Sequence, residues 1–411
     1  MSVGPCDSGT LLPVDLAIGH LLERAPRPPQ LHCLALEQAL GRVLGTDVHA
    51  PRALPGWDNS AMDGYALRAA DLPAAGGCLV LAGRVAAGQA ATTALLAGQA
   101  VRIFTGAPLP PGADTVVPQE LCRVEGQQLW LPAVSVGQHV RKAGEEVREG
   151  HLLLPAGKRL RAQELGLLAA CGVSWVEVYR PLRVGLLSSG DELREPGQPL
   201  APGQIYNSNR YCLSALLQGW GVEVHDYGAM ADELQASKQT LHLAAQECDL
   251  LLSSGGVSVG EEDHLKQAIR ELGQVDFWRL AIQPGKPLAF GTVAGKPWLG
   301  LPGNPAAALI TALVVLRPFL LRSQGLRDVV PQPVALPAGF DWPQANRRRQ
   351  YLRARLVPGD NGQCRVQLHP QQSSAMLSAA CWADGLALVE CQQQLRQDDP
   401  VQFLSFAELM Q

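Results

Sequence analysis

Two Gly/Ser-rich loops that carry carboxylates are the part of this sequence best suited to chemistry. The first is Ser188–Glu192 and the second is Ser253–Asp263, and each follows a short apolar run. A strand that ends in such a loop and leads into a helix exposes backbone N–H groups, hydroxyls and a helix N-terminus, which attract phosphate or another oxyanion. Carboxylates at the same place would instead hold a metal ion or transfer protons. The two loops therefore predict a site for a phosphate-bearing substrate that is handled with a divalent cation.

Each loop also has a simpler structural interpretation. Ser188–Glu192 could be an ordinary turn in which Asp191 caps a helix. In the second loop, Glu261, Glu262 and Asp263 could complement the dipole of the following helix, which accounts for two acids more easily than for three. The second loop has neither a GxGxxG pattern nor a P-loop lysine, so dinucleotide dehydrogenases and Walker-type ATPases fit poorly.

Two further segments favour the same edge of a sheet. In Gly300–Ala308, Asn304 is expected to be an N-cap and Pro305 the first helical residue, which predicts either another open helix N-terminus or merely a well-built turn. In Ile282–Phe290, Lys286 lies between two prolines, so a stiff backbone could aim its ammonium group at an anion. A solvated surface lysine is the alternative.

The N-terminal half holds a second group of polar residues. Asp58, Asn59, Ser60 and Asp63 fall within six residues, which indicates either an Asx-rich turn or a rim loop that presents Asp63 to a substrate. Thr105 and Gly106 follow a short apolar run, and a Thr-Gly strand end is again suited to an anion.

The patterning of apolar residues predicts the elements that would position these groups. Leu11–Leu44 is expected to be helical on either side of Pro26–Gln30, and Pro51–Leu131 to be a small β domain. From Arg183 onward a βαβ rhythm predicts a parallel sheet, whose ligands bind at the carboxyl ends of the strands. The expected strands are Arg183–Leu187, Val222–Tyr227 and Leu250–Ser253, and the expected helices are Asn209–Gln218, Glu233–Ala245 and Glu261–Leu272. After Pro318 the chain is Pro-rich, and short alternating strands such as Tyr351–Val357 predict a C-terminal β domain.

Composition limits the class of protein. A chain of 411 residues with 47% hydrophobic residues predicts two to four domains. The net charge of −4 argues against broad nucleic-acid binding, although Asn346–Gln350, with three arginines, could form a local basic pocket. Ten scattered cysteines, no signal peptide and no apolar stretch of the ~20 residues that span a bilayer predict a cytoplasmic protein without a membrane partner.

Six motifs in order resemble one known family. They are Asp58–Ala66, Thr105–Pro108, Ser189–Leu193, Ser253–Gly260, Pro284–Pro287 and Gly300–Pro305. They resemble the motifs of the MoeA-type molybdopterin molybdenumtransferases, the family that also contains the C-terminal domain of gephyrin, and the resemblance covers nearly the whole chain.

The resemblance implies a multidomain α/β plus β fold and a defined reaction. The expected domains are an N-terminal helical and linker domain (1–50 and 140–180), a small β-rich insertion domain (51–139), a three-layer molybdopterin-binding α/β domain with a parallel-rich sheet (181–327) and a β-barrel-like C-terminal domain (328–411). Family members insert molybdate into adenylylated molybdopterin, cleave its pyrophosphate with Mg²⁺ and release AMP. The implied partners are a second copy, as a homodimer, and an upstream molybdopterin adenylyltransferase.

The resemblance also assigns roles to residues. Asp63, Glu192, Asp232 and Asp263 are implied to be catalytic, and the last three to hold Mg²⁺, which prefers oxygen ligands. Asp63 and Thr105 would reach in from the partner subunit. The implied molybdate pocket consists of Ser258, Lys286, Pro287, Arg353 and Ser373. The remaining implied substrate-binding residues are Gly106, Arg141, Ser188, Ser189, Gly190, Asn207, Gly255, Gly256, Gly285, Pro302, Gly303, Asn304 and Pro305.

Three positions depart from the family pattern. Gln283 stands where many members have a lysine, and the lost charge should weaken molybdate attraction by about 1–3 kcal/mol if the site is desolvated. Glu146 and Asn207 each stand where an aspartate is expected.

The sequence leaves two other functions open. A molybdopterin adenylyltransferase uses a related α/β domain alone, whereas this chain has additional β domains. A non-catalytic dimeric scaffold of the gephyrin type would need an exposed groove for a partner peptide, and no feature of the sequence requires one.

Overall fold

The structure, a computed structural model, describes residues 11–88, 93–230, 233–255, 264–359 and 362–411. The chain forms two compact units. One unit consists of Cys33–Leu40 and Leu44–Val178, and the other of Met1–His32, Gly41–Val43 and Tyr179–Gln411.

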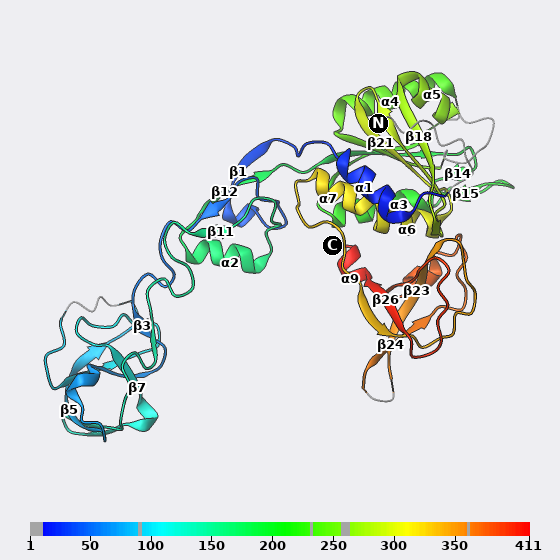
Figure 1. The fold of residues 1–411 in the computed structure, drawn as a ribbon. Helices are drawn as coiled ribbons and strands as arrows, with labels where there is room; N and C mark the ends of the chain where they lie inside the picture. Colours follow the sequence, from blue (N-terminus) through cyan, green and yellow to red (C-terminus); the bar gives the residue numbers. More distant parts are fainter. Residues whose placement is uncertain (1–10, 89–92, 231–232, 256–263, 360–361) are drawn as a thin grey trace. The chain divides into compact units, whose positions relative to one another are not determined.

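A six-stranded mixed sheet forms the centre of the larger unit (Figure 1). Its strand order is β16-β13-β17-β21-β20-β18, in which the first four strands are parallel and the last two are antiparallel to their neighbours. The strands are β13 (Arg183–Ser189), β16 (Glu223–Met230), β17 (Leu250–Ser254), β18 (Gly273–Arg279), β20 (Pro287–Val293) and β21 (Lys296–Leu301).

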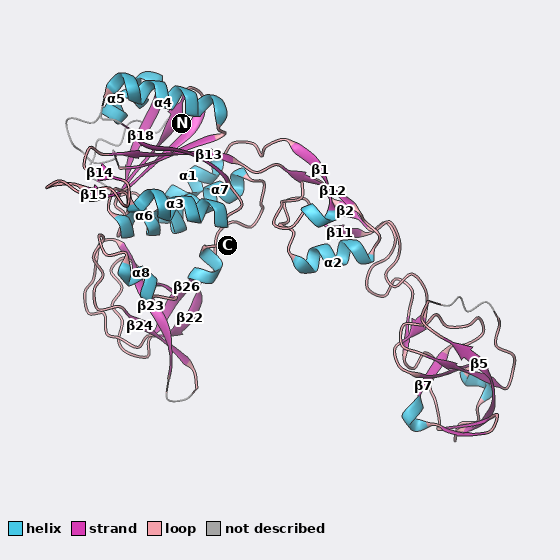
Figure 2. Ribbon diagram, turned by 180° about the vertical axis from the view of Figure 1, so that it is seen from behind, coloured by secondary structure: helices cyan, strands magenta, loops and turns pink. Residues whose placement is uncertain are grey.

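Both faces of this sheet are covered, because its strands are apolar on both sides. Side chains alternate between the faces of a strand, so Leu186 packs into one hydrophobic cluster and Leu187 into another. Helices α4 (Leu234–Glu247) and α5 (His264–Leu272) cover one face, and α1, α3, α6 and α7 cover the other (Figures 1 and 2). The bounds of the latter are α1 (Val14–Glu23), α3 (Ser208–Gly219), α6 (Pro305–Thr311) and α7 (Arg317–Ser323), with a π-helical turn η4 (Ala312–Leu316) between α6 and α7.

The continuous helix Pro305–Ser323 is long and apolar enough to cross a membrane by length and composition. The expectation that no stretch approaches that length was therefore wrong. Because 94% of its apolar window is buried inside the domain, it is a core helix here.

The C-terminal part of the same unit is a second six-stranded sheet. The main path runs β19-β23-β25-β26-β22, and β24 pairs with β23 on its other side. An isolated bridge from Ala338 to Val366 links the end of β22 back to β24, which gives the sheet a barrel-like closure. The elements are β19 (Ile282–Gln283), β22 (Val334–Pro337), β23 (Arg349–Pro358), β24 (Cys364–Leu368), β25 (Gly385–Val389), β26 (Pro400–Ser405), α8 (Ser378–Trp382) and α9 (Phe406–Leu409). A further pair, β14 (Leu193–Arg194) and β15 (Ile205–Tyr206), precedes α3.

The smaller unit is rich in strands. Its main sheet has the order β7-β4-β6-β5-β9-β8, with β5 and β6 parallel. The elements are β2 (Val48–His49), β3 (Asn59–Ser60), β4 (Gly64–Leu67), β5 (Gly77–Val85), β6 (Gln99–Ile103), β7 (Thr115–Pro118), β8 (Arg123–Glu125), β9 (Gln128–Leu131), β10 (Val140–Arg141), β11 (Leu152–Leu154), the helix α2 (Ala162–Ala170), and the short turns η1 (Leu36–Gln38), η2 (Ala69–Asp71) and η3 (Gln119–Leu121). Strand β1 (Leu31–Ala35) pairs with β12 (Trp175–Tyr179).

The strands and helices predicted after Arg183 are confirmed within a few residues for the described part of the chain. The helical interpretation of Leu11–Leu44 was right for Val14–Glu23 and wrong beyond Pro29. Leu31–Ala35 is a strand because it finds a partner in Trp175–Tyr179, some 140 residues away, which short-range periodicity does not reveal.

An ion pair between Arg180 and Asp249 lies at the start of the central sheet. We expect its contribution to the free energy of unfolding to be measurable. Both terminal nitrogens of Arg180 donate to Asp249 at 2.7 Å, and the backbone N–H of Arg183 donates to the same carboxylate at 2.9 Å. Burial acts to raise the pKa of Asp249, but these hydrogen bonds outweigh it and hold the pKa below its usual value. The stabilisation is therefore present above the unfolded-state pKa, near 4, and is lost as the pH falls.

Replacement of Asp249 by Asn should lower the free energy of unfolding by about 2 kcal/mol at pH 7, with a smaller difference from wild type below pH ~4. Urea unfolding at both pH values measures this. Asp276→Asn is the control, because its pair with Arg24 is about half exposed and should contribute less than about 1 kcal/mol. Equal losses for the two variants would contradict the assignment.

Candidate functional site

A cleft of about 1120 Å³ lies at one edge of the central sheet. The carboxyl ends of the parallel strands β13, β17 and β21 reach it, and so do the amino end of β20 and the first turns of α3 and α6. Ligands bind at this edge in open α/β sheets. The C-terminal β domain adds Arg348 and Gln372–Ala375 to the lining.

Close backbone contacts bring the strand ends together. Gly255, which follows β17, has φ +88°, and a Cβ at this position would lie 2.5 Å from the carbonyl oxygen of Ser189. The backbone N–H of Gly255 also donates to the carbonyl oxygen of Leu301 at 3.2 Å. Position 255 therefore requires glycine, both for its left-handed backbone and for lack of space.

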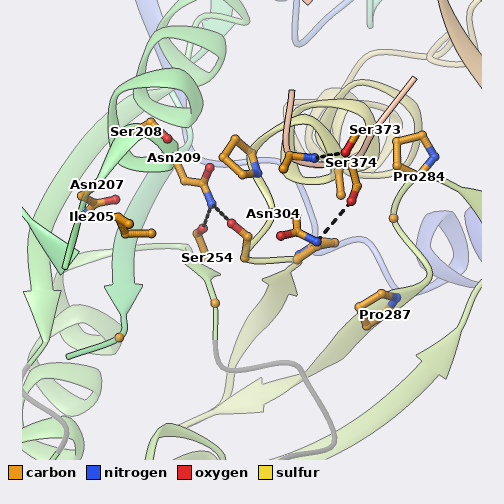
Figure 3. A pocket seen from close by; sticks show the side chains of 18 of the residues that line it. Ile205, Asn207, Ser208, Asn209, Ser254, Pro284, Pro287, Asn304, Ser373 and Ser374 are labelled. Atoms are coloured by element: carbon orange, nitrogen blue, oxygen red, sulfur yellow. Dashed lines mark hydrogen bonds between the residues drawn. The ribbon is translucent and has the colours of Figure 1, made fainter. Parts of the chain in front are cut away.

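Asn209 joins three of the segments that form the cleft (Figure 3). Its side-chain nitrogen donates to the hydroxyl of Ser254 at 2.7 Å and to the carbonyl oxygen of Gly303 at 2.8 Å. The residue lies in the first turn of α3 and is 9% exposed. One buried amide thus connects α3, the end of β17 and the turn between β21 and α6.

The loop after β13 does not lead directly into a helix, as the sequence had suggested. The short pair β14–β15 intervenes, and α3 begins only at Ser208 with Asn207, not Asp191, as its cap. Glu192 therefore lies on an exposed turn at the cleft rather than in a first helical turn.

The structure also corrects the expectation that the N-terminus of α6 is open. Asn304 and Pro305 occupy the predicted cap and first helical position. However, the backbone N–H groups of Ala306 and Ala307 donate to the carbonyl oxygen of Ser374 at 3.0 and 3.3 Å. The Asn304 side chain turns to the Ser374 hydroxyl at 3.3 Å (Figure 3). This helix end is already satisfied by the C-terminal domain.

Charged groups of both signs line the cleft. Asp191 and Glu192 supply carboxylates, and Lys286 and Arg348 supply cations. Lys286 is exposed, and Gly285 before it requires glycine because a Cβ there would collide with the Thr311 hydroxyl. The lining can therefore hold an anion at one place and a cation at another.

A smaller chamber of about 90 Å³ shares Gln283, Pro284 and Gln372 with the cleft. Arg353, on β23, lines this chamber and is 0% exposed. One terminal nitrogen donates to the carbonyl oxygen of Ser373 at 3.0 Å, whereas Nε and Nη1 have no partner among the described residues. Burial lowers the pKa of Arg353 to about 10, so the group is still a cation at neutral pH. A buried, incompletely paired cation beside a cavity is suited to an anionic ligand.

The predicted site residues fall into five groups. Those that line the cleft are Ser189, Gly190, Glu192, Asn207, Gly255, Gly285, Lys286, Pro287, Pro302, Gly303, Asn304, Pro305 and Ser373. Ser188 is buried behind the cleft, and Arg353 lies in the smaller chamber. Asp63, Thr105, Gly106 and Arg141 belong to the other unit. Asp232, Gly256, Ser258 and Asp263 lie outside the described residues.

Asp63 and Thr105 are brought together within the smaller unit. The backbone N–H of Thr105 donates to Asp63 Oδ1 at 2.8 Å, and its hydroxyl donates to the same oxygen at 2.9 Å. These two hydrogen bonds hold the pKa of Asp63 below its usual value. The carboxylate is therefore ionised at neutral pH and has a fixed orientation.

Several lining residues were not identified from the sequence, chiefly Asn209, Arg348, Gln372 and Ser374. Arg348 belongs to the arginine run Asn346–Gln350 that had been noted as a possible basic pocket. The other three are single polar residues whose spacing carries no signal. Within the described ranges, no group of three or more His, Cys, Asp or Glu side chains could hold a metal ion.

The fold and the cleft together define an α/β protein whose lined cleft, at the carboxyl ends of its parallel strands, is suited to an anionic ligand. Family comparison matches residues 12–172 to the MoeA N-terminal region (domain I and II), residues 185–322 to a probable molybdopterin binding domain, and residues 335–406 to the MoeA C-terminal region (domain IV). The chain belongs to the MoeA family of molybdopterin molybdenumtransferases.

Individual relatives agree with this assignment. A molybdopterin molybdenumtransferase of Haemophilus influenzae is 38% identical over 372 residues, which cover 90% of this chain and 92% of that protein. Another from Nostoc sp. is 41% identical over 297 residues, 70% of this chain and 68% of that protein. The crystal structure of the molybdopterin biosynthesis moeA protein from Pyrococcus horikoshii superimposes with a TM-score of 0.82 and 27% identity, over 97% of this chain and 100% of that one.

We expect Asn209→Ala to disrupt the cleft without unfolding the protein. The change leaves the Ser254 hydroxyl and the Gly303 carbonyl without their donor, so it should lower the free energy of unfolding by about 1–3 kcal/mol. It should also increase hydrogen exchange of the backbone around these two residues. Gln218→Ala, an exposed change on the same helix, is the control for urea unfolding. A variant Asn209→Ala as stable as this control would refute the role.

Proposed function

We propose that this protein is a molybdopterin molybdenumtransferase that inserts molybdate into adenylylated molybdopterin, with pyrophosphate cleavage and release of AMP. The observation that carries the proposal is one cleft in which Gly-rich backbone turns, two carboxylates and two cations meet. Membership of the MoeA family supports the choice of this reaction among those that use phosphate-bearing substrates.

Within this proposal, the ends of β13, β17 and β21 hold the phosphate groups of the substrate. The turns at Ser189–Gly190, Gly255 and Pro302–Gly303 present small residues and backbone to the cleft, so a phosphate can approach closely. Molybdate lies beside Lys286 and Ser373, toward the chamber of Arg353, where positive charge and hydroxyl donors suit a tetrahedral oxyanion.

The acids hold Mg²⁺ in this proposal. Glu192, with Asp232 and Asp263, supplies carboxylate oxygens, and oxygen donors are the ligands that Mg²⁺ prefers. The presence of both Asp191 and Glu192 in the cleft lining fits such an ion. When bound, Mg²⁺ would neutralise charge on the phosphates as the bond breaks.

The proposal also covers the domain division, the oligomeric state, the delivery of substrate and the cellular location. We propose the four domains given above, a homodimer in which Asp63 and Thr105 of one subunit complete the cleft of the other, delivery of substrate by an upstream adenylyltransferase, and a cytoplasmic location. The fixed, ionised Asp63 supports a role at a substrate rather than a purely structural one, because it is exposed on its own unit.

One incubation separates the three candidate functions. Purified protein is mixed with adenylylated molybdopterin, Mg²⁺ and molybdate, and AMP and active cofactor are measured. Both products together support the proposal. ATP consumption with free molybdopterin as acceptor supports an adenylyltransferase instead, and neither activity in a stable dimer supports a scaffold.

Glu192→Gln should lower AMP release by about 10²-fold or more, because an amide neither carries the negative charge nor holds Mg²⁺ equally well. Its urea midpoint should match that of wild type, since the side chain is exposed. Glu195→Gln is the control. Glu195 lies in the same segment between β13 and α3, but it pairs with Arg210 and does not line the cleft. Wild-type AMP release by Glu192→Gln would refute the role of Glu192.

The variant Arg353→Met tests whether Arg353 contributes to molybdate affinity or to the free energy of unfolding. Because Nε and Nη1 of this buried cation have no partner among the residues that the structure describes, its removal should leave the free energy of unfolding within about 1 kcal/mol of wild type or raise it. Molybdate affinity should fall at least about tenfold. Arg355→Met, two residues along the same strand, should leave affinity unchanged. A large loss of stability with unaltered affinity would identify Arg353 as structural.

A further inference from the structure

Three consecutive arginines begin the strand β23 region, and they have different surroundings. Arg347 is exposed. Arg349 is bound by two carboxylates, with Asp15 at 2.7 Å and Glu390 at 2.9 Å. Arg348 lines the cleft, and its terminal nitrogen donates to Gln283 Oε1 at 2.9 Å. Within the described ranges no carboxylate pairs with Arg348, so a neutral amide fixes its position while its charge stays available.

Gln283 is itself held firmly. Its Oε1 also accepts a hydrogen bond from Gln350 Nε2 at 3.2 Å, and Gln350 is 2% exposed. The backbone pairing of β19 with β23 places Gln283 opposite Gln350. Two donors therefore converge on one carbonyl oxygen, which orients the Gln283 amide and anchors Arg348 against the wall of the cleft.

This wall separates the cleft from the smaller chamber. Gln283, Pro284 and Gln372 line both cavities, with Arg348 on the cleft side and Arg353 on the chamber side. Two guanidinium groups without carboxylate partners in the described chain thus lie in two neighbouring cavities that share three lining residues.

We propose that Arg348 is a binding residue for the tetrahedral oxyanion substrate, and that Gln283 is the residue that positions it. The inference rests on the proposed function and adds a residue to its site. A guanidinium offers two parallel N–H donors to an oxyanion. A neutral glutamine at position 283 holds that group by accepting a hydrogen bond, whereas a lysine there would repel it. In this proposal Arg348 supplies the charge that is absent at position 283, which is an alternative to the expectation that Gln283 weakens molybdate binding.

The test is calorimetric titration of the full-length protein with molybdate in the absence of pterin, followed by turnover. Arg348→Gln should weaken molybdate binding about tenfold or more, and in turnover should raise the KM for molybdate more than it lowers kcat. Arg347→Gln removes the same charge from the neighbouring exposed position and should change neither quantity. Equal effects of the two variants would overturn the inference, because they would reduce it to general electrostatic attraction.

The role of Gln283 is tested by moving the charge. Gln283→Lys alone removes the acceptor and places an ammonium group beside Arg348, so it should weaken molybdate binding. In the Arg348→Gln background, the same substitution should strengthen binding again. The inference is supported if Gln283→Lys lowers molybdate affinity in the wild-type background and raises it in the Arg348→Gln background. A rise in molybdate affinity in both backgrounds would overturn the positioning role of Gln283.

Failure of this inference differs from failure of the proposed function. If wild type binds molybdate and releases AMP while Arg348→Gln behaves like wild type, only the role of Arg348 is wrong. If wild type neither binds molybdate nor releases AMP from adenylylated molybdopterin, the proposed function falls and this inference with it.

Discussion

The site depends on the convergence of three parallel strand ends at one point. Gly255 approaches the Ser189 carbonyl oxygen more closely than any side chain would allow, and its N–H donates to Leu301. Asn209 then joins Ser254 to Gly303 from the first turn of α3. Because a buried amide that loses its partners is costly, this junction has one stable arrangement. The small residues and backbone left at its surface are what an anion can reach.

The C-terminal β domain completes the site rather than merely adjoining it. Its Ser374 carbonyl oxygen occupies the N-terminus of α6, which removes an anion site that the isolated α/β domain would offer. In exchange it supplies Arg348 to the cleft and Arg353 to the chamber behind it. The positive charge that this domain contributes lies on guanidinium groups, which can bind an oxyanion through two hydrogen bonds, and not on the end of α6.

Sequence reasoning succeeded where the signal is local and periodic. The strands β13 and β17, the cap at Asn304 and the Gly-rich turns follow from short-range patterns, and the residues at those turns line the cleft. It failed where a distant segment decides. Leu31–Ala35 is a strand because of Trp175–Tyr179, and the end of α6 is closed by Ser374, about 70 residues along the chain.

The sequence by itself determined the family, the order of the elements and most of the turn residues, because glycine, proline and cap residues are constrained by their own backbone conformation. Only the tertiary structure decided which polar side chains act together. Nothing in the sequence singles out Asn209, and the arginine run and the departure at Gln283 do not reveal that Arg348 and Gln283 are partners; each of the three is hydrogen-bonded to another segment. Hydrogen bonds and ion pairs depend on atoms a few ångströms apart in space, and that distance is set by packing rather than by spacing along the chain.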